Sequence, residues 1–189
     1  MEGEVTVSMV NDLHWEAPVS LLPKEGTYEL WDIINLSPDP HPFHIHLVAH
    51  RLIHRQDFDL ARWQAKECQM EDGSCLVGGT FAPREEEMGW KDTVKAYNNQ
   101  VTRILMHFAP FDGERFKFDV SAGPGYVIHC HILNHEDNHM MRPFKVLSAN
   151  STVTLPTVPG FNSGLKSETR RKASKQTLRA TMIKADSAM

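Results

Sequence analysis

The stretch His129-Cys130-His131-Ile132-Leu133-Asn134-His135 decides the interpretation of this 189-residue chain. A second histidine-rich stretch, His41-Pro42-Phe43-His44-Ile45-His46, lies far upstream. Two imidazoles, one thiolate and a weak axial thioether are the ligands of electron-transferring blue copper. The chain supplies such a set as His41, Cys130, His135 and Met140. The sequence therefore predicts a copper site.

The other histidines of the two stretches predict a second copper centre. Residues two apart in an extended segment share a face, so His44 and His46 are expected to point together. His129 and His131 likewise share a face, while Cys130 between them points to the other side. One short strand would then serve two metal sites, with only a few covalent bonds between the Cys130 thiolate and the neighbouring imidazoles.

Zinc is the main alternative to copper at these residues. An isolated His-x-His pair is more often a surface pair or part of a zinc site. Zinc also accepts thiolate and imidazole, but it gains little from a thioether, and two histidine-rich segments exceed the needs of one tetrahedral site. The combination of His-Cys-His with a further His and Met therefore favours copper.

These motifs resemble the C-terminal cupredoxin domain of the multicopper oxidases, and the resemblance covers roughly residues 3–148. Within that family the chain is similar to spore-coat laccases, bilirubin oxidases and the plant low-phosphate-root ferroxidases, because Leu47 follows His46 where ordinary laccases carry Gly. Further stretches agree with this subgroup: Gly26-Thr27-Tyr28-Glu29-Leu30-Trp31, Phe58-Asp59-Leu60-Ala61-Arg62, Gly89-Trp90-Lys91-Asp92-Thr93, His135-Glu136-Asp137 and Met140-Met141-Arg142-Pro143.

The resemblance implies a role for each motif residue. The type 1 copper would be held by His41, Cys130, His135 and Met140. A type 2 copper would use His44, and the type 3 coppers would use His46, His129 and His131. The family's trinuclear cluster takes twice as many imidazoles as this chain provides. The type 1 set is therefore complete, the type 2 and type 3 sets are partial, and the missing ligands are expected from N-terminal cupredoxin domains.

The implied activity is that of an oxidase. It couples one-electron oxidation of a small reducing substrate, such as a phenol, a pigment or ferrous iron, to the four-electron reduction of dioxygen to water. Cys130, His129 and His131 would carry the electrons, and the chain is interpreted as a fragment of such an enzyme. The alternatives are a stand-alone blue copper protein that carries electrons or binds copper without oxidase activity, and a truncated, inactive gene product. A mere carrier has no use for the second histidine set.

Acidic residues near the motifs raise two further expectations. Relatives carry Glu or Asp at the position of Asn134, and an amide cannot deliver protons at neutral pH, so oxygen reduction is expected to be weakened. Asp92, Glu136 and Asp137 are candidates for orienting the imidazoles. The run at 85–87 could attract ferrous iron, although a solvated acidic loop is the simpler interpretation.

The hydrophobic pattern predicts an all-β fold, and the resemblance makes it a cupredoxin-like Greek-key sandwich with one short helix. Strands are expected at 5–10, 27–35, 101–108 and 126–130, and the helix at 58–67. Residues 1–149 would form the domain, and 150–189 a basic, disordered tail. Of the three cysteines, Cys68 and Cys75 remain after Cys130 and are expected either to form a disulfide or to stay unpaired.

Composition adds limits on partners and location. The residues from 160 onward include seven Lys or Arg and two acidic residues, a net charge of +5, which leaves −9 for the first 159 residues of a chain that totals −4. We expect no nucleic-acid partner and, without a long apolar run, no membrane span. The acidic start lacks a signal peptide, and the full-length protein is expected to be extracellular or in the secretory pathway. Asn35-Leu36-Ser37 and Asn150-Ser151-Thr152 fit the glycosylation pattern.

Overall fold

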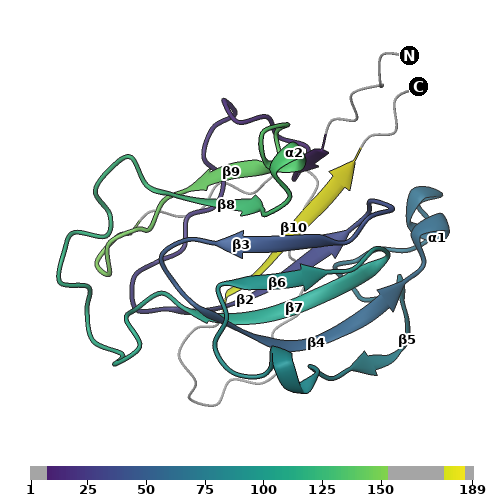
Figure 1. Ribbon diagram of the computed structural model, residues 1–189, viewed down its shortest axis with the longest axis horizontal. Helices are drawn as coiled ribbons and strands as arrows, with labels where there is room; N and C mark the ends of the chain where they lie inside the picture. The colour runs from purple at the N-terminus through teal and green to yellow at the C-terminus, as the bar shows by residue number, and fades with distance from the viewer. Residues whose placement is uncertain (1–7, 153–176, 186–189) are drawn as a thin grey trace.

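A computed structural model describes residues 8–152 and 177–185 of the chain. It contains two β-sheets and very little helix (Figure 1). The strands are β1 (Ser8–Val10), β2 (Tyr28–Asn35), β3 (His41–Ile45), β4 (His50–Phe58), β5 (Leu76–Phe81), β6 (Thr93–Ala96), β7 (Gln100–His107), β8 (Tyr126–Cys130), β9 (Met141–Phe144) and β10 (Thr177–Ala185). The short helices are α1 (Leu60–Gln64), α2 (Leu133–Glu136) and a 3-10 turn at Glu85–Glu87. The all-β prediction is therefore confirmed.

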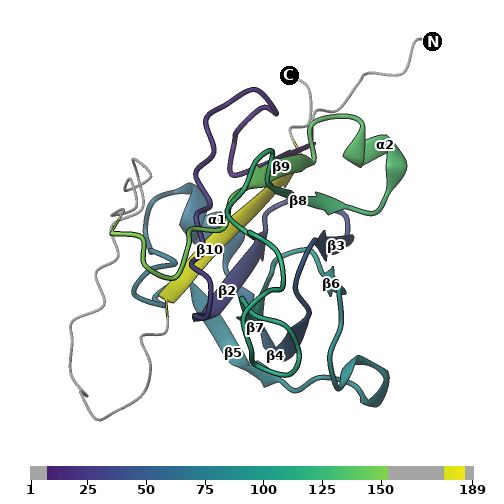
Figure 2. The same cartoon turned by 90° about the vertical axis from the view of Figure 1, so that its left-hand side faces the viewer.

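The two sheets form separate layers, which Figure 2 shows from the side. The larger sheet has the order β1-β10-β2-β7-β4-β5, and the smaller one has the order β6-β3-β8-β9. Their inner faces bury a single main core that includes Trp31 of β2, Ile104 of β7, Phe43 of β3 and Phe144 of β9. Burial of this apolar surface supplies most of the driving force for folding. The core also contains Cys130, so the predicted metal site lies against the interior of the sandwich.

The predicted elements mostly match the observed ones. The strands expected at 27–35, 101–108 and 126–130 are β2, β7 and β8, and the expected helix is the shorter α1. The helix begins two residues later than predicted, because the Asp59 carboxylate accepts a hydrogen bond from the Arg62 N–H and so caps its N-terminus. For the first predicted strand, residues 8–10 form β1 and residues 5–7 lie outside the described part of the chain.

Cys68 and Cys75 form a disulfide, one of the two outcomes that the sequence left open. It closes the loop between α1 and β5. Both sulfurs pack in a second, smaller core with Phe58 and Val101. None of the described helices is long and apolar enough to cross a membrane.

The prediction of a disordered tail is wrong for residues 177–185, which form β10. This strand pairs in parallel with β2 and antiparallel with β1, so it separates the two (Figure 1). The prediction rested on the basic composition of the tail, whereas the segment 177–185 contains several β-branched residues, the type that favours strands. The rest of the predicted tail from residue 153 lies outside the described residues.

Candidate metal centre

Two neighbouring strands of the small sheet bring the two histidine-rich stretches together. β3 pairs antiparallel with β8, which places Phe43 opposite Cys130 and His44 opposite His129. Along β3 the burial alternates, with His41 on the buried face and His44 on the more accessible one. Because both strands follow this period of two, one face of the pair carries Cys130 and the other carries the imidazoles beside it. On β8, Cys130 falls in one group of possible metal ligands, and His129 falls in the other.

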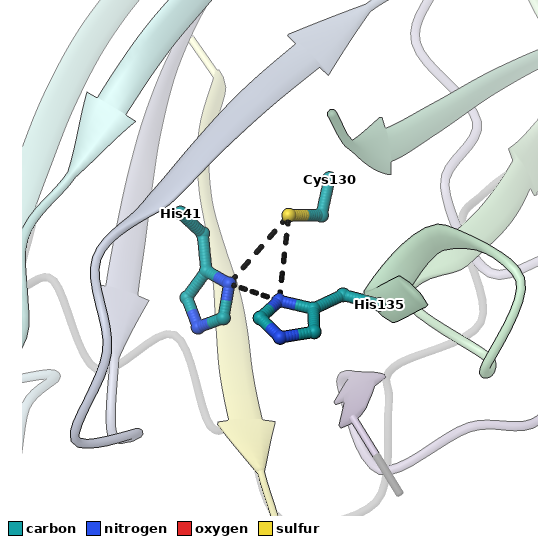
Figure 3. Close-up of side chains that lie close together, drawn as sticks. All are labelled: His41, Cys130 and His135. Carbon is teal, nitrogen blue, oxygen red and sulfur yellow. Dashed lines mark hydrogen bonds between the residues drawn. The ribbon is translucent and has the colours of Figure 1, made fainter. Parts of the chain in front are cut away.

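The first cluster consists of His41, Cys130 and His135 (Figure 3). The Cys130 Sγ lies 3.6 Å from the His41 Nδ1 and 3.9 Å from the His135 Nδ1, and the two nitrogens are 3.2 Å apart. The point equidistant from the corners of such a triangle lies about 2.1 Å from each, a length typical of bonds between transition metals and imidazole. These three side chains therefore fit one metal ion in a trigonal arrangement.

The backbone around Cys130 holds this cluster in place. The Ile132 N–H donates a hydrogen bond to the Cys130 Sγ at 3.4 Å, and the Cys130 N–H donates to the Met140 carbonyl at 3.0 Å. The Met140 N–H in turn donates to the His135 carbonyl at 3.0 Å. Helix α2, which the sequence did not predict, turns the chain between Cys130 and Met140 and carries His135 back toward the sulfur (Figure 3). Met140 is fully buried in the same core as Cys130.

Burial shifts the proton equilibria of the first cluster. Together with the nearby His135, and against the opposing effect of Asp39, burial lowers the pKa of His41 to about 4. His41 is therefore neutral at physiological pH and able to act as a ligand. Burial raises the pKa of the Cys130 thiol to about 11. The thiol keeps its proton at neutral pH until a metal displaces it.

The second cluster is made of four imidazoles. Ligand atoms of His44, His129 and His131 lie within 4.8 Å of one another. The fourth imidazole, His46, has its Nε2 only 3.3 Å from the His129 Nε2. Burial lowers the pKa of both His44 and His46, with smaller effects from neighbouring histidines and acids. Imidazole nitrogens gathered in this way form a donor set that suits copper and zinc.

Acidic and carbonyl groups contact these imidazoles and orient them, as hydrogen-bond partners of metal-binding histidines do. The His44 Nδ1 lies 2.9 Å from the Asp92 carbonyl and 3.1 Å from the Thr93 hydroxyl, which leaves its Nε2 for a metal. The Glu136 carboxylate lies 3.2 Å from the His129 Nδ1. Of the predicted orienting residues, Glu136 contacts an imidazole by its side chain, and Asp92 does so through its backbone.

Asn134 lies on α2, next to His135 of the first cluster. Its side chain is exposed on α2, whereas Glu136 on the same short helix is partly buried against His129. The expectation that an amide at 134 weakens oxygen reduction stays a prediction. The Glu136 carboxylate contacts an imidazole of the second cluster.

Two residues near the first cluster had no functional assignment from the sequence. The Ser37 hydroxyl lies 2.6 Å from the His41 Nε2, and the Asn35 carboxamide contacts Ser37. The only sequence signal at Asn35 and Ser37 was a glycosylation pattern, which lies close to His41 in the sequence. The remaining histidines belong to neither group of possible ligands: His50 is fully buried on β4, and His14 packs edge-on against His139.

Comparison with known proteins agrees with this geometry. Residues 5–150 match the sequence model of the family described as Multicopper oxidase. The chain belongs to the multicopper oxidase family. It is 42% identical over 154 residues to Multicopper oxidase LPR1 of Arabidopsis thaliana, covering 76% of this chain and 26% of that protein. It is 41% identical over 141 residues to a laccase of Bacillus subtilis (strain 168), covering 74% of this chain and 24% of that protein.

One solved structure has a similar fold. A multicopper oxidase from Campylobacter jejuni, whose title calls it a metallo-oxidase, is 28% identical with a TM-score of 0.50, and the match covers 72% of this chain and 22% of that one. The chain therefore spans about a quarter of the length of the relatives it matches. Family membership implies copper, and the thiolate-imidazole and all-imidazole clusters both fit that metal. This is the cupredoxin-like domain of a multicopper oxidase.

Proposed function

We propose that this multicopper oxidase domain accepts single electrons at the first cluster and passes them to the second. The four type 1 ligands in this proposal are His41, Cys130, His135 and Met140. Copper bound at the two clusters would supply the redox chemistry, taking electrons from a reducing substrate and reducing dioxygen to water. The observation that carries the proposal is the strand β8, in which Cys130 belongs to one cluster and its neighbour His129 to the other.

The residues of the chain define the route of the electron. His41 is buried, whereas His135 is partly exposed at the start of the route, so we assign electron entry to the His135 edge. From the Cys130 sulfur the path runs through the side chain and backbone to the adjacent His129 or His131. The Ile132 N–H stabilises the thiolate that this path requires.

The second cluster is proposed to be completed by another part of the enzyme. We assign His44 to the type 2 copper and His46, His129 and His131 to the type 3 coppers. Four imidazoles leave open positions around three metal ions, and the matched part of this chain covers only about a quarter of each relative. We therefore propose that N-terminal cupredoxin domains supply the other imidazoles, that residues 1–149 form the C-terminal domain, and that the protein works in an oxidising, extracytoplasmic setting, which the disulfide supports.

The reducing substrate is proposed to be a small one-electron donor, which includes phenols, pigments and ferrous iron. The acidic run at 85–87 is less available for iron than the sequence suggested. Glu87 pairs with the buried Arg55 at 2.7 Å, and this hydrogen bond lowers its pKa. Two of the three carboxylates remain for an incoming cation.

Copper stoichiometry and colour test the proposal. The chain expressed with copper should bind copper with the intense blue absorption of a thiolate site, and Cys130→Ser should lose that absorption. A matched control is Cys68→Ser with Cys75→Ser, which removes the other two cysteines and should stay blue. A blue Cys130→Ser variant, or a colourless wild-type chain loaded with copper, would refute the assignment. A chain that stays blue and exchanges electrons at an unchanged rate after replacement of His129 and His131 would instead be a simple electron carrier.

A further inference from the structure

A buried hydroxyl contacts the ring nitrogen of His41 that faces away from the cluster. The Ser37 Oγ lies 2.6 Å from the His41 Nε2, and Ser37 is 1% exposed. The other ring nitrogen, Nδ1, is the one that faces Cys130 and His135. A neutral imidazole carries one proton on one of its two nitrogens. The direction of the Ser37 hydrogen bond therefore decides which nitrogen is free to bind a metal.

The orientation of the Asn35 side chain fixes that direction. Its Nδ2 lies 2.8 Å from the Asp39 carbonyl and 2.9 Å from the Ala96 carbonyl, and both of these groups only accept. Its Oδ1 lies 3.0 Å from the Ser37 N–H, which only donates. The backbone on both sides thus sets which end of the amide is nitrogen and which is oxygen.

With the amide fixed, the Ser37 hydroxyl has one possible role toward His41. Its oxygen lies 2.7 Å from the Asn35 Oδ1 and 3.0 Å from the Asp39 carbonyl, and both can only accept. The single hydroxyl proton is used on one of these acceptors. The Ser37 oxygen must therefore accept from the His41 Nε2–H, which leaves the Nδ1 lone pair directed at the cluster.

We propose that Ser37 is a positioning residue that holds His41 in its Nε2-protonated tautomer before copper binds. The inference rests on the proposed function in one respect, namely that His41 is a copper ligand. Asn35 ends β2 in the large sheet, and Ala96 pairs with His41 in the small sheet, so the hydrogen-bond chain ties the ligand to both layers. Asn35 is fully buried and its amide nitrogen donates two hydrogen bonds. The glycosylation pattern Asn35-Leu36-Ser37 therefore serves the metal site rather than carrying a glycan.

Two variants with side chains of the same shape isolate the hydroxyl. Ser37→Thr keeps the hydroxyl, whereas Ser37→Val has the shape of threonine without the hydroxyl. Ser37→Ala removes the hydroxyl with less crowding. Ser121→Ala is the matched control, because the Ser121 hydroxyl also bonds a local side-chain oxygen, that of Asp119, at 2.6 Å. Two measurements are made on each variant: the His41 tautomer in the metal-free chain by nitrogen-15 NMR, and the affinity for added copper with the potential of the blue site.

We expect wild type, Ser37→Thr and Ser121→Ala to hold His41 with its proton on Nε2. Ser37→Val and Ser37→Ala should populate the Nδ1-protonated form and bind copper about ten- to a hundred-fold more weakly, the range for lost partners of metal ligands. An unchanged tautomer in both hydroxyl-free variants overturns the inference, whatever happens to their thermal stability. A wild-type chain that binds no copper would refute the proposed function, while the tautomer comparison would still decide the role of Ser37.

Discussion

Cys130 must change its protonation state for the site to work. Burial holds the pKa of its thiol near 11, so the metal-free chain carries the neutral thiol at neutral pH. We predict that copper binding at pH 7.5 releases a proton from Cys130, and that the apparent affinity rises about tenfold per pH unit through this range. Calorimetry in buffers of different ionisation enthalpy measures the release. In Cys130→Ser, the heat of copper binding should no longer contain this buffer-dependent part. An equal buffer dependence in wild type and Cys130→Ser would contradict the prediction.

Met140 and Met141 are adjacent, and only one can be the axial ligand. Met140 is fully buried beside Cys130, whereas Met141 begins β9 and is partly exposed. Met140→Leu should keep copper but raise the reduction potential by at least about 60 mV, a tenfold change in the relative affinity for its two oxidation states, because a weak axial donor stabilises Cu(II) more than Cu(I). Voltammetry of Met141→Leu is the control. A larger shift at Met141 would show that the register is wrong.

His50 makes the fold sensitive to acid. It is fully buried, and neither ring nitrogen has a hydrogen-bond partner among the described residues. Burial lowers its pKa to about 4, below the unfolded value of 6.5. As the pH falls, His50 binds a proton at a higher pH in the unfolded chain than in the folded chain. The free energy of unfolding therefore decreases as the pH falls from about 6.5 to 4.

We predict that the free energy of unfolding decreases between pH 7 and pH 5 by about 2 kcal/mol less in His50→Leu than in wild type. Urea unfolding at the two pH values measures it in the metal-free chain. His54→Leu, at a less buried position of the same strand, should change the pH dependence less. An equal loss in wild type and His50→Leu would rule out His50 as the acid-sensitive group.

Strand β9 is fastened to the segment at 14–18 by one side chain. Arg142 is 1% exposed and donates to four backbone carbonyls, at 3.1 Å to Trp15 and Ala17, at 2.9 Å to Pro18, and also to His14. A guanidinium presents five donors in a fixed fork, which an ammonium cannot copy. This contact holds the segment at 14–18 against β9, the strand that directly follows Met140 and pairs with β8.

We predict that Arg142→Lys lowers the free energy of unfolding by roughly 2 to 3 kcal/mol, since buried carbonyls lose their donors. Denaturant unfolding measures the change, and limited proteolysis should show new cleavage within 14–18. Arg103→Lys is the control, because Arg103 pairs with Asp32 through two 2.6 Å contacts but is 32% exposed. Equal losses in both variants would mean that the buried position of Arg142 has no special importance.

Elements with a strong local pattern could be predicted from the sequence, and those formed by distant contacts could not. The alternation around Cys130 was sufficient to divide β8 between two clusters, because strand geometry depends only on neighbouring residues. Helix α2 and the approach of Glu136 to His129 depend on the irregular turn after His131, for which no sequence period exists. The link from Asn35 to Ala96 joins two sheets and has no local signal at all.

At the scale of the whole molecule, the four imidazoles of the second cluster limit what this chain can do alone. We predict that the copper-loaded chain does not sustain four-electron reduction of dioxygen, because open positions around the metals would be filled by water. Fusion to the N-terminal cupredoxin domains of a close relative should restore oxygen consumption, measured with an oxygen electrode and a phenolic or ferrous donor. The same fusion carrying His131→Ala is the control and should stay inactive. Sustained turnover by the unfused monomer would refute the need for added ligands.

The order β1-β10-β2 affects how this sheet is completed during protein synthesis. Thr177 aligns with Glu29, so β2 leaves the ribosome long before the strand that covers its edge. Until then β2 exposes a row of unpaired N–H and C=O groups, which can recruit strands from other nascent chains. Parallel pairing across so much sequence is also slow to form. The yield of soluble protein should therefore depend on how soon the last strand is synthesised, and slow translation of the region before residue 177 should favour aggregates over folded domain.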